Sequence, residues 1–342
     1  MPDLPDPGLA SAVEDVVGST GFSGVVRVDR AGSTVLDAAF GLADRRHAVP
    51  MSTSTRLGTA SGTKGLTALT VLSLVADGSL ALDQPVREVL GTDLPLVDDR
   101  VTVEHLLTHR SGIGDYFDEE VETDVTDHVL TVPVHTLVTT EDYLPALEGR
   151  PQVFEPGQRV VYNNSAFVVL ALVAGRVGGR RFEELVGERV CGPAGMTSTG
   201  FLRGDDLPGD AATGYPWADR DRTNVLHLPV VGSGDGGAYT TTADVAAMWT
   251  SLFAGRILPV GMVKDLVRLR STDEPGQGYG LGVEVGRDEG VVGLTGSDAG
   301  VSFRSIHRRR SQVTWTVISN TSEGAWPVAR VLGTHLGEPP QA

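Results

Sequence analysis

The stretch LGTASGTKGLTALTVLSL, residues 57–74, places glycines, hydroxyl residues and one lysine directly before an apolar run. It could be a loop that grips phosphate or a turn that carries a nucleophilic serine. A phosphate-binding P-loop requires G-x-x-x-x-G-K-[ST], with glycine before the lysine and a hydroxyl residue after it. Here Thr63 precedes Lys64 and Gly65 follows it, and no clear apolar strand leads into the stretch. The order of residues therefore argues against a P-loop.

Ser61 and Lys64 form an S-x-x-K pattern in the same stretch. Residues three apart on a helix lie on one face, so the hydroxyl and the amine are expected to meet. A serine is a weak nucleophile until a nearby base takes its proton, and lysine serves as that base when burial disfavours its ammonium form. The apolar helix body that would bury the lysine stem is supplied by Leu66, Leu69, Leu72 and Leu74. Alone the pattern is weak, because chance produces it in about one such chain in ten.

Two later segments fit the same chemistry. VVYNNSAF contains Y-x-N, with Tyr162 and Asn164 at its ends, and GLTGSDAG contains LTGS, residues 294–297. A phenol can relay protons to a leaving group, and a carboxamide can hold a substrate amide or orient a lysine. A Thr-Gly edge strand can offer a backbone N–H to an oxyanion and lie beside an extended substrate.

Composition excludes several classes of function. The chain has 342 residues, which suits one large domain or two subdomains, and its net charge of −16 disfavours nucleic acid and anionic membrane surfaces as partners. Cys191 is the only cysteine, so no intramolecular disulfide can form and a zinc-thiolate site is effectively excluded. The Cys191 side chain is expected to be a small buried hydrophobic group. The sequence predicts no metal and no cofactor.

The N-terminal segment predicts a helix and no leader. Residues 6–18, DPGLASAVEDVVG, suit a helix with Asp6 as its cap, and no basic segment followed by an apolar one suggests a signal peptide. The longest apolar run, residues 166–175, is too short to span a bilayer. A cytoplasmic location is therefore the expectation.

The remaining pattern alternates between strand and helix signals. A hairpin is expected from residues 21–30 and 33–43, and helices are expected to end at Gly78, at Gly112 and at residues 178–179. Another helix is expected at residues 241–255 and a last one near Trp326, with strands at 278–286, 290–296, 300–309 and 312–320. Strands at both ends with helices between them predict an α+β fold, in which an antiparallel sheet from both termini carries a large helical insertion.

At this point the chain resembles the class C β-lactamase-like serine hydrolases, which include DD-peptidases and esterases. The resemblance follows the family's order through residues 54–86, 101–113, 154–179, 191–201 and 234–248. It implies a single β-lactamase/transpeptidase-like catalytic domain over 1–342, with an α/β subdomain (roughly 1–60 plus 230–342) and a mainly helical one (61–229). It also implies Ser61 as nucleophile, Lys64 and Tyr162 as proton-transfer groups, Asn164 as their partner, and an oxyanion hole from the backbone N–H groups of Ser61 and Ser297.

One position departs from the family pattern. The third motif, here Leu294, Thr295, Gly296 and Ser297, normally begins with a lysine or histidine that helps bind a substrate carboxylate. Leucine cannot do this, and Arg304 or His307 on the next strand are the candidates to replace the charge. The departure favours an esterase, or an amide hydrolase or acyltransferase with a neutral small acyl substrate. A β-lactamase or D-amino-acid peptidase, and a non-catalytic ligand-binding protein of the same fold, stay open as alternatives.

Other patterns receive structural interpretations. GSGDGG, residues 232–237, matches G-x-G-x-x-G but lacks the βαβ context of a dinucleotide site, so a flexible loop near the cleft is expected. His105 and His109 have zinc-compatible spacing without H-E-x-x-H, which favours packing and capping roles. The acidic run at 115–127 predicts a solvated loop, and no G-x-S-x-G elbow is present.

Overall fold

The central element of the fold is an antiparallel sheet that draws strands from both ends of the chain. A computed structural model describes residues 7–117, 124, 126–274, 277–286 and 290–337. Within these residues the sheet has eight strands in the order β2-β1-β13-β12-β11-β10-β9-β8. The five long strands are β1 (Gly24–Arg30), β2 (Ser33–Phe40), β11 (Val291–Asp298), β12 (Val301–Arg308) and β13 (Val313–Ser319). Because β1 pairs with β13 along its whole length, the two ends of the chain complete one sheet, and the predicted α+β fold is confirmed.

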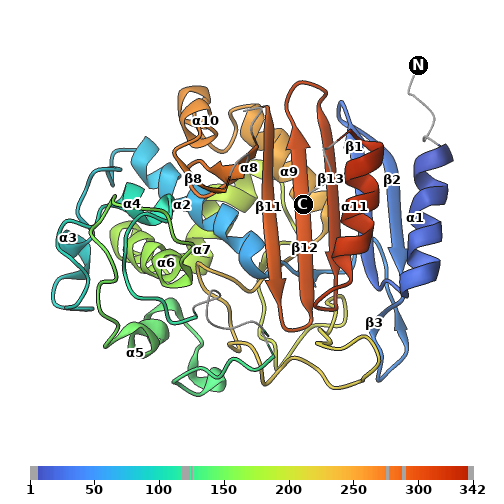
Figure 1. The fold of residues 1–342 in the computed structure, drawn as a ribbon, viewed down its shortest axis with the longest axis horizontal. Coiled ribbons are helices and arrows are strands. Elements are labelled where there is room, and N and C mark those ends of the chain that lie inside the picture. The colour runs from blue at the N-terminus through green and yellow to red at the C-terminus, as the bar shows by residue number, and fades with distance from the viewer. Residues whose placement is uncertain (1–6, 118–123, 125, 275–276, 287–289, 338–342) are drawn as a thin grey trace.

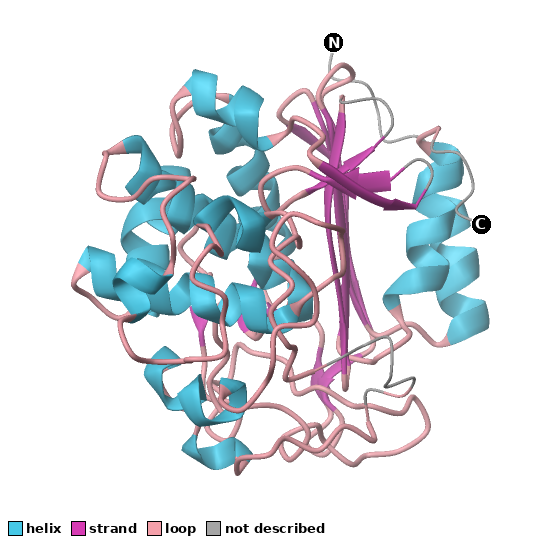
Figure 2. Cartoon of the chain, turned by 60° about the vertical axis from the view of Figure 1, so that its left-hand side comes forward, coloured by secondary structure: helices cyan, strands magenta, loops and turns pink. Residues whose placement is uncertain are grey.

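Helices cover both faces of this sheet. Two terminal helices, α1 (Pro7–Thr20) and α11 (Ala325–His335), pack on one face, and α9 (Thr242–Phe253) with the helical body packs on the other (Figures 1 and 2). Strand β13 is therefore buried at every residue, which explains its dense β-branched and aromatic sequence VTWTVIS. Helix α1 begins at Pro7 as predicted, while Asp6, its predicted cap, lies outside the described residues.

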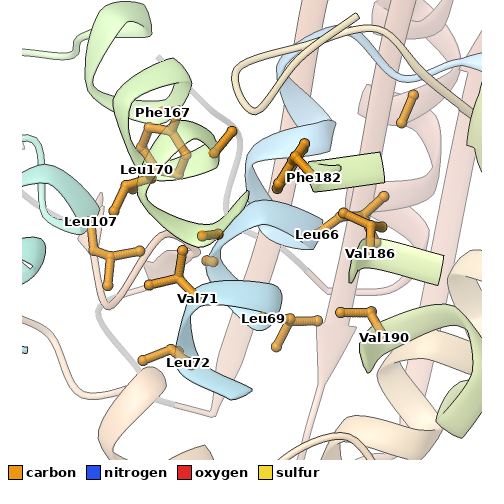
Figure 3. Close-up of a cluster of buried hydrophobic side chains, with 14 of the residues drawn as sticks. Leu66, Leu69, Val71, Leu72, Leu107, Phe167, Leu170, Phe182, Val186 and Val190 are labelled. Atoms are coloured by element: carbon orange, nitrogen blue, oxygen red, sulfur yellow. The ribbon is translucent and has the colours of Figure 1, made fainter. Parts of the chain in front are cut away.

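Two buried helices form the centre of the helical body. These are α2 (Thr63–Ala76) and α6 (Asn164–Gly178), and their side chains are buried from Thr63 to Leu74 and from Asn164 to Ala174. Figure 3 shows side chains of α2 in one buried cluster with Phe167 and Leu170 of α6 and with Phe182 and Val186 of the next helix. Helices buried on all sides need apolar residues all round, as both sequences have.

Shorter elements connect these layers. The additional helices are α3 (Arg87–Leu90), α4 (Val103–Leu107), α5 (Leu144–Leu147), α7 (Phe182–Val186), α8 (Gly192–Ala194) and α10 (Val260–Leu266). The additional strands are β3 (Leu42–Asp44), β4 (Val49–Pro50), β5 (Leu57–Gly58), β6 (Gly200–Phe201), β7 (Ala238–Thr240), β8 (Ser271–Glu274), β9 (Gln277–Tyr279) and β10 (Glu284–Gly286). Among the described helices, none has both the length and the apolar character that crossing a bilayer requires.

Two boundary predictions were wrong. Helix α4 ends at Leu107 rather than near Gly112, since His109 adopts a left-handed backbone (φ 56°) and its carbonyl accepts the Val161 N–H. Residues 278–286 are not one strand: β9 and β10 form a hairpin in which Gly282 takes a φ of 78°. Three other predictions are confirmed: Gly78 follows α2, Gly179 follows α6, and Cys191 is buried.

Buried histidines make the stability of this fold sensitive to acid. Burial lowers the pKa of His109 to about 3 and that of His307 to about 4, with Lys64 and Arg309 adding to the respective effects. Both are thus neutral when folded, whereas an unfolded histidine titrates near 6.5. The stability they contribute is present above pH 6.5 and is lost as the pH falls toward these folded values, by about 2 kcal/mol per histidine at pH 5.

We therefore expect the free energy of unfolding of the parent protein to fall between pH 7 and pH 5. In His307→Phe the same pH change should lower it by about 2 kcal/mol less than in the parent protein. The phenyl ring preserves the stacking of His307 on Phe253 but cannot be protonated. Urea unfolding at the two pH values measures the difference, and the same substitution at the exposed His335 controls for histidine loss. An identical pH dependence in His307→Phe and the parent protein would contradict the assignment to this residue.

Candidate active site

Ser61 and Lys64 meet at the start of α2. Ser61 lies in a 3₁₀ turn, Ala60–Gly62, that leads directly into the helix, and Ala60 enters this turn with a left-handed backbone (φ 44°). The Lys64 Nζ lies 3.0 Å from the Ser61 Oγ. Lys64 is only 5% exposed, as the apolar body of α2 predicts, while Ser61 is half-buried. The S-x-x-K spacing therefore produces the contact that a helix start predicts.

Two further partners of the Lys64 amine are carbonyl oxygens. Its Nζ donates to the Asn164 Oδ1 at 2.7 Å and to the backbone carbonyl of Asp235 at 2.8 Å. An ammonium group has three donors, whereas a neutral amine has two N–H groups and a lone pair. In the neutral form the two carbonyls can take the two N–H groups, and the Ser61 hydroxyl can donate to the lone pair. These three partners therefore fit a neutral Lys64.

The Y-x-N segment also borders the Lys64 amine. The Tyr162 ring centroid is 4.9 Å from the Lys64 Nζ, and Asn164 begins α6. The middle residue, Asn163, has a structural role: its side chain caps α6 by accepting the Ala166 N–H and donates to the Ile113 carbonyl. The outer two residues of the pattern are therefore the ones directed to Lys64.

His109 holds the backbone on both sides of Tyr162. Its carbonyl accepts the Val161 N–H at 3.0 Å and its Nδ1 accepts the Asn163 N–H at 3.1 Å. Its ring stacks on the Tyr162 ring with centroids 4.6 Å apart. The lowered pKa of His109 keeps Nδ1 free of a proton and able to accept. His105 instead caps α4 by accepting the Thr102 N–H, so the pair has the packing and capping roles that were predicted.

Asp115 anchors the start of α6. Its carboxylate accepts the backbone N–H groups of Asn164 and Ser165 and the Ser165 hydroxyl, at 2.7 to 3.0 Å. Burial raises the pKa of Asp115 to about 6, while its hydrogen bonds at a helix N-terminus favour the charged form. The prediction of a solvated loop is thus wrong for this first residue of the acidic run, and residues 118–123 and 125 of the run lie outside the described residues.

Strand β11 passes very close to the Ser61 turn at Gly296. A Cβ there would lie 2.0 Å from the Thr59 carbonyl and 3.0 Å from the Ser61 nitrogen, so only glycine fits. Among the described residues, strand β10 pairs with Val292 and Gly293 of β11 and with no later residue of that strand, so the residues after Gly293 form an edge on that side. The backbone of Ser297 follows directly on this approach, as a partner of Ser61 in an oxyanion hole requires.

The structure separates Leu294 from Arg304 and His307, the two side chains expected to supply the positive charge that the family usually has at position 294. Leu294 is 5% exposed, and a Cβ on Gly65 of α2 would lie 2.7 Å from its Cδ1. Thr295 pairs with Arg304 on the opposite face of the strand, where Arg304 donates to the Thr295 hydroxyl at 2.6 Å and lies 3.7 Å from Glu284. His307 stacks on Phe253 and bonds Thr314. Neither cation lies beside Leu294.

Comparison with known proteins identifies the relatives of this site. A family model described as Beta-lactamase matches residues 9–333. The chain belongs to the beta-lactamase family. A crystal structure of a penicillin-binding protein from Bacillus halodurans is 34% identical, with a TM-score of 0.89 over 94% of this chain and 99% of that one. The fold is thus the β-lactamase/transpeptidase-like fold that the resemblance implied.

Two curated members of the beta-lactamase family are similar to parts of the chain. Esterase EstB from Burkholderia gladioli is 37% identical over 187 residues, which is 52% of this chain and 46% of that protein. A D-aminopeptidase from Brucella anthropi is 28% identical over 93% of this chain and 60% of its own length. Proteins of this family are serine hydrolases, and these relatives support hydrolase activity in general.

One residue at the site of this beta-lactamase family member was not singled out from sequence. Asp235, in the GSGDGG turn, is 8% exposed; its carbonyl holds Lys64 and its carboxylate accepts the Tyr116 hydroxyl. The turn is tightly packed rather than flexible, because a Cβ on Gly232 would lie 2.3 Å from the Gly236 carbonyl and one on Gly234 2.2 Å from that of Phe167. The signal available in the sequence was the position of Asp235, an acidic residue among the four glycines of GSGDGG.

Proposed function

We propose that this protein is a serine hydrolase that forms an acyl-enzyme on Ser61. Its substrate is a small ester or amide without a carboxylate next to the scissile bond, and the acyl group passes to water or another acceptor. The observation that carries the proposal is the hydrogen bond between Ser61 and the buried Lys64 amine, which also donates to two carbonyl oxygens. That set of partners suits a lysine that receives the serine proton.

The proposed reaction has two halves. The Ser61 Oγ attacks the substrate carbonyl carbon while its proton passes to the Lys64/Tyr162 pair, and the negative charge on the carbonyl oxygen develops against the N–H groups of Ser61 and Ser297. As the tetrahedral intermediate collapses, Tyr162 protonates the departing alkoxide or amine. Water then attacks the acyl-enzyme by the reverse sequence, releasing the acid and restoring the Ser61 hydroxyl.

The burial of Leu294 favours this proposal over a β-lactamase. A leucine against Gly65 offers no charge to a substrate carboxylate, and the similarity to EstB fits esters as substrates. The similarity to a D-aminopeptidase supports amide hydrolysis as a second candidate. A non-catalytic binding protein would not need the Ser61–Lys64–Asn164 hydrogen bonds, which the chain retains.

Active-site labelling tests the proposal. A fluorophosphonate should add once to the protein, and peptide mass mapping should place the adduct on Ser61, because that hydroxyl bonds the buried Lys64 amine. Ser61→Ala should lose both the adduct and ester hydrolysis, whereas Ser19→Ala, at an exposed position on α1, should keep both. An adduct on a different serine, or ester hydrolysis that survives Ser61→Ala, would rule out the proposed nucleophile.

A further inference from the structure

A pocket of about 70 Å³ adjoins the Ser61 site. One wall comes from Asp235 and Gly236, in the turn whose carbonyl holds Lys64. Another comes from Asp298, the residue after Ser297 on β11. The two walls thus start at residues that border the nucleophile. The larger groove of about 1290 Å³, between α9 and the strand ends, shares no lining residue with the Ser61 site.

Two buried side chains of this pocket offer hydrogen-bond acceptors. The Asp235 carboxylate accepts the Tyr116 hydroxyl through Oδ2, and the backbone N–H groups of Asp235 and Gly236 also favour its charged form. Asn224 donates to the Ala299 carbonyl through Nδ2, and its Oδ1 has no hydrogen-bond partner within the described part of the chain. Both side chains are more than nine-tenths buried, at 8% and 7% exposure, and both line the pocket.

The remaining lining completes a site for a cationic group. Asp298 adds a second carboxylate, and the described lining contains no lysine, arginine or histidine. The opposite side is apolar, formed by Leu202, Val225, Leu228, Pro229 and Val230. Buried acceptors are normally paired, and a buried carboxylate is stable when a donor of opposite charge reaches it. An ammonium group supplies both the N–H donors and the charge, and its short alkyl stem suits the apolar side.

We propose that this pocket binds a protonated amine carried by the ester or amide whose carbonyl lies at Ser61. The inference rests on the proposed function and narrows its substrate to amine-bearing compounds. The Asp235 carboxylate is the principal charge partner, and the Asn224 Oδ1 and Asp298 are secondary ones. Because the Asp235 carbonyl also accepts from Lys64, the pocket adjoins the Ser61 site, and the amine is carried on either the acyl or the alcohol side of the scissile bond.

Matched ester pairs test the inference and separate these two sides. For the acyl side, glycine methyl ester is compared with methyl propionate, and β-alanine methyl ester with methyl butyrate. For the alcohol side, 2-(dimethylamino)ethyl acetate is compared with 3-methylbutyl acetate. Each pair has nearly the same shape and differs by the charge. In at least one pair we expect the ratio of kcat/KM, cationic over neutral, to fall about tenfold or more in Asp235→Asn, since a charged hydrogen bond is lost.

Comparing ratios within one variant cancels any general loss of activity, and Asp298→Asn should lower the same ratio by a smaller factor. Ratios that stay constant in Asp235→Asn while neutral esters are still hydrolysed would overturn the inference but leave the Ser61 mechanism standing. Absence of both ester hydrolysis and a Ser61 adduct in the parent protein would instead overturn the proposed function. If Asp235→Asn does not fold, inhibition of neutral-ester hydrolysis by n-propylammonium, compared with 1-butanol, decides: equal inhibition refutes the inference.

Discussion

Replacing Lys64 with arginine should lower kcat for ester hydrolysis by at least about a hundredfold, the low end of the loss expected when a general base is removed. Arginine can still donate to the carbonyls of Asn164 and Asp235. It cannot lose its proton near neutral pH, so it has no lone pair to receive the Ser61 proton. The expected defect is therefore the loss of proton transfer from Ser61.

The chain contains a natural control for this experiment. Its only other lysine, Lys264, is exposed on α10, and Lys264→Arg should hydrolyse the same ester at the parent rate. Circular dichroism and urea unfolding show whether each variant is folded, and stopped-flow or steady-state ester assays give kcat. Near-normal turnover in folded Lys64→Arg would show that Lys64 is not the proton acceptor and would leave Tyr162 as the first base.

Local pattern predicted the parts of this protein that depend on local geometry. The β-branched runs at residues 24–30, 301–308 and 313–319 became paired strands because most of their residues are buried between the layers on the two faces of the sheet. The Ser61–Lys64 contact followed from helical spacing alone, as the 3.0 Å hydrogen bond shows. In these segments the spacing of apolar residues along the chain favours the same secondary structure as the tertiary packing does, so the local prediction was sufficient.

Features that depend on distant segments were missed. The early end of α4 depends on hydrogen bonds that His109 accepts from the backbone N–H groups of residues 161 and 163, which no local pattern reveals. Asp235 reaches Lys64 because a packed glycine turn meets α2 and α6, and its neighbours in sequence predicted only a loop. Arg304 was considered beside Leu294, yet its pairing with Thr295 places it on the other strand face, and strand pairing cannot be read from one strand's sequence.

Leu294 should determine which substrates this site accepts. A charged hydrogen bond to a carboxylate contributes roughly 1.5–3 kcal/mol, so its absence should lower kcat/KM for carboxylate-bearing substrates about ten- to a hundredfold. The parent protein is therefore expected to prefer esters without a carboxylate over penicillins and D-Ala-D-Ala peptides. Leu294→His or Leu294→Lys should raise acylation by a carboxylate-bearing β-lactam and leave neutral-ester hydrolysis level or lower.

The comparison of two substrates in one variant is essential, because Leu294 also packs against Gly65 and its replacement will cost stability. Both substrates acylate the same Ser61, so a folding loss lowers both rates and leaves their ratio unchanged. Arg304→Gln, on the opposite face of the sheet, supplies the matched control and should not alter the β-lactam-to-ester ratio. If the parent protein already hydrolyses β-lactams faster than neutral esters, and Arg304→Gln abolishes that preference, then Arg304 supplies the missing charge and the esterase proposal loses its main support.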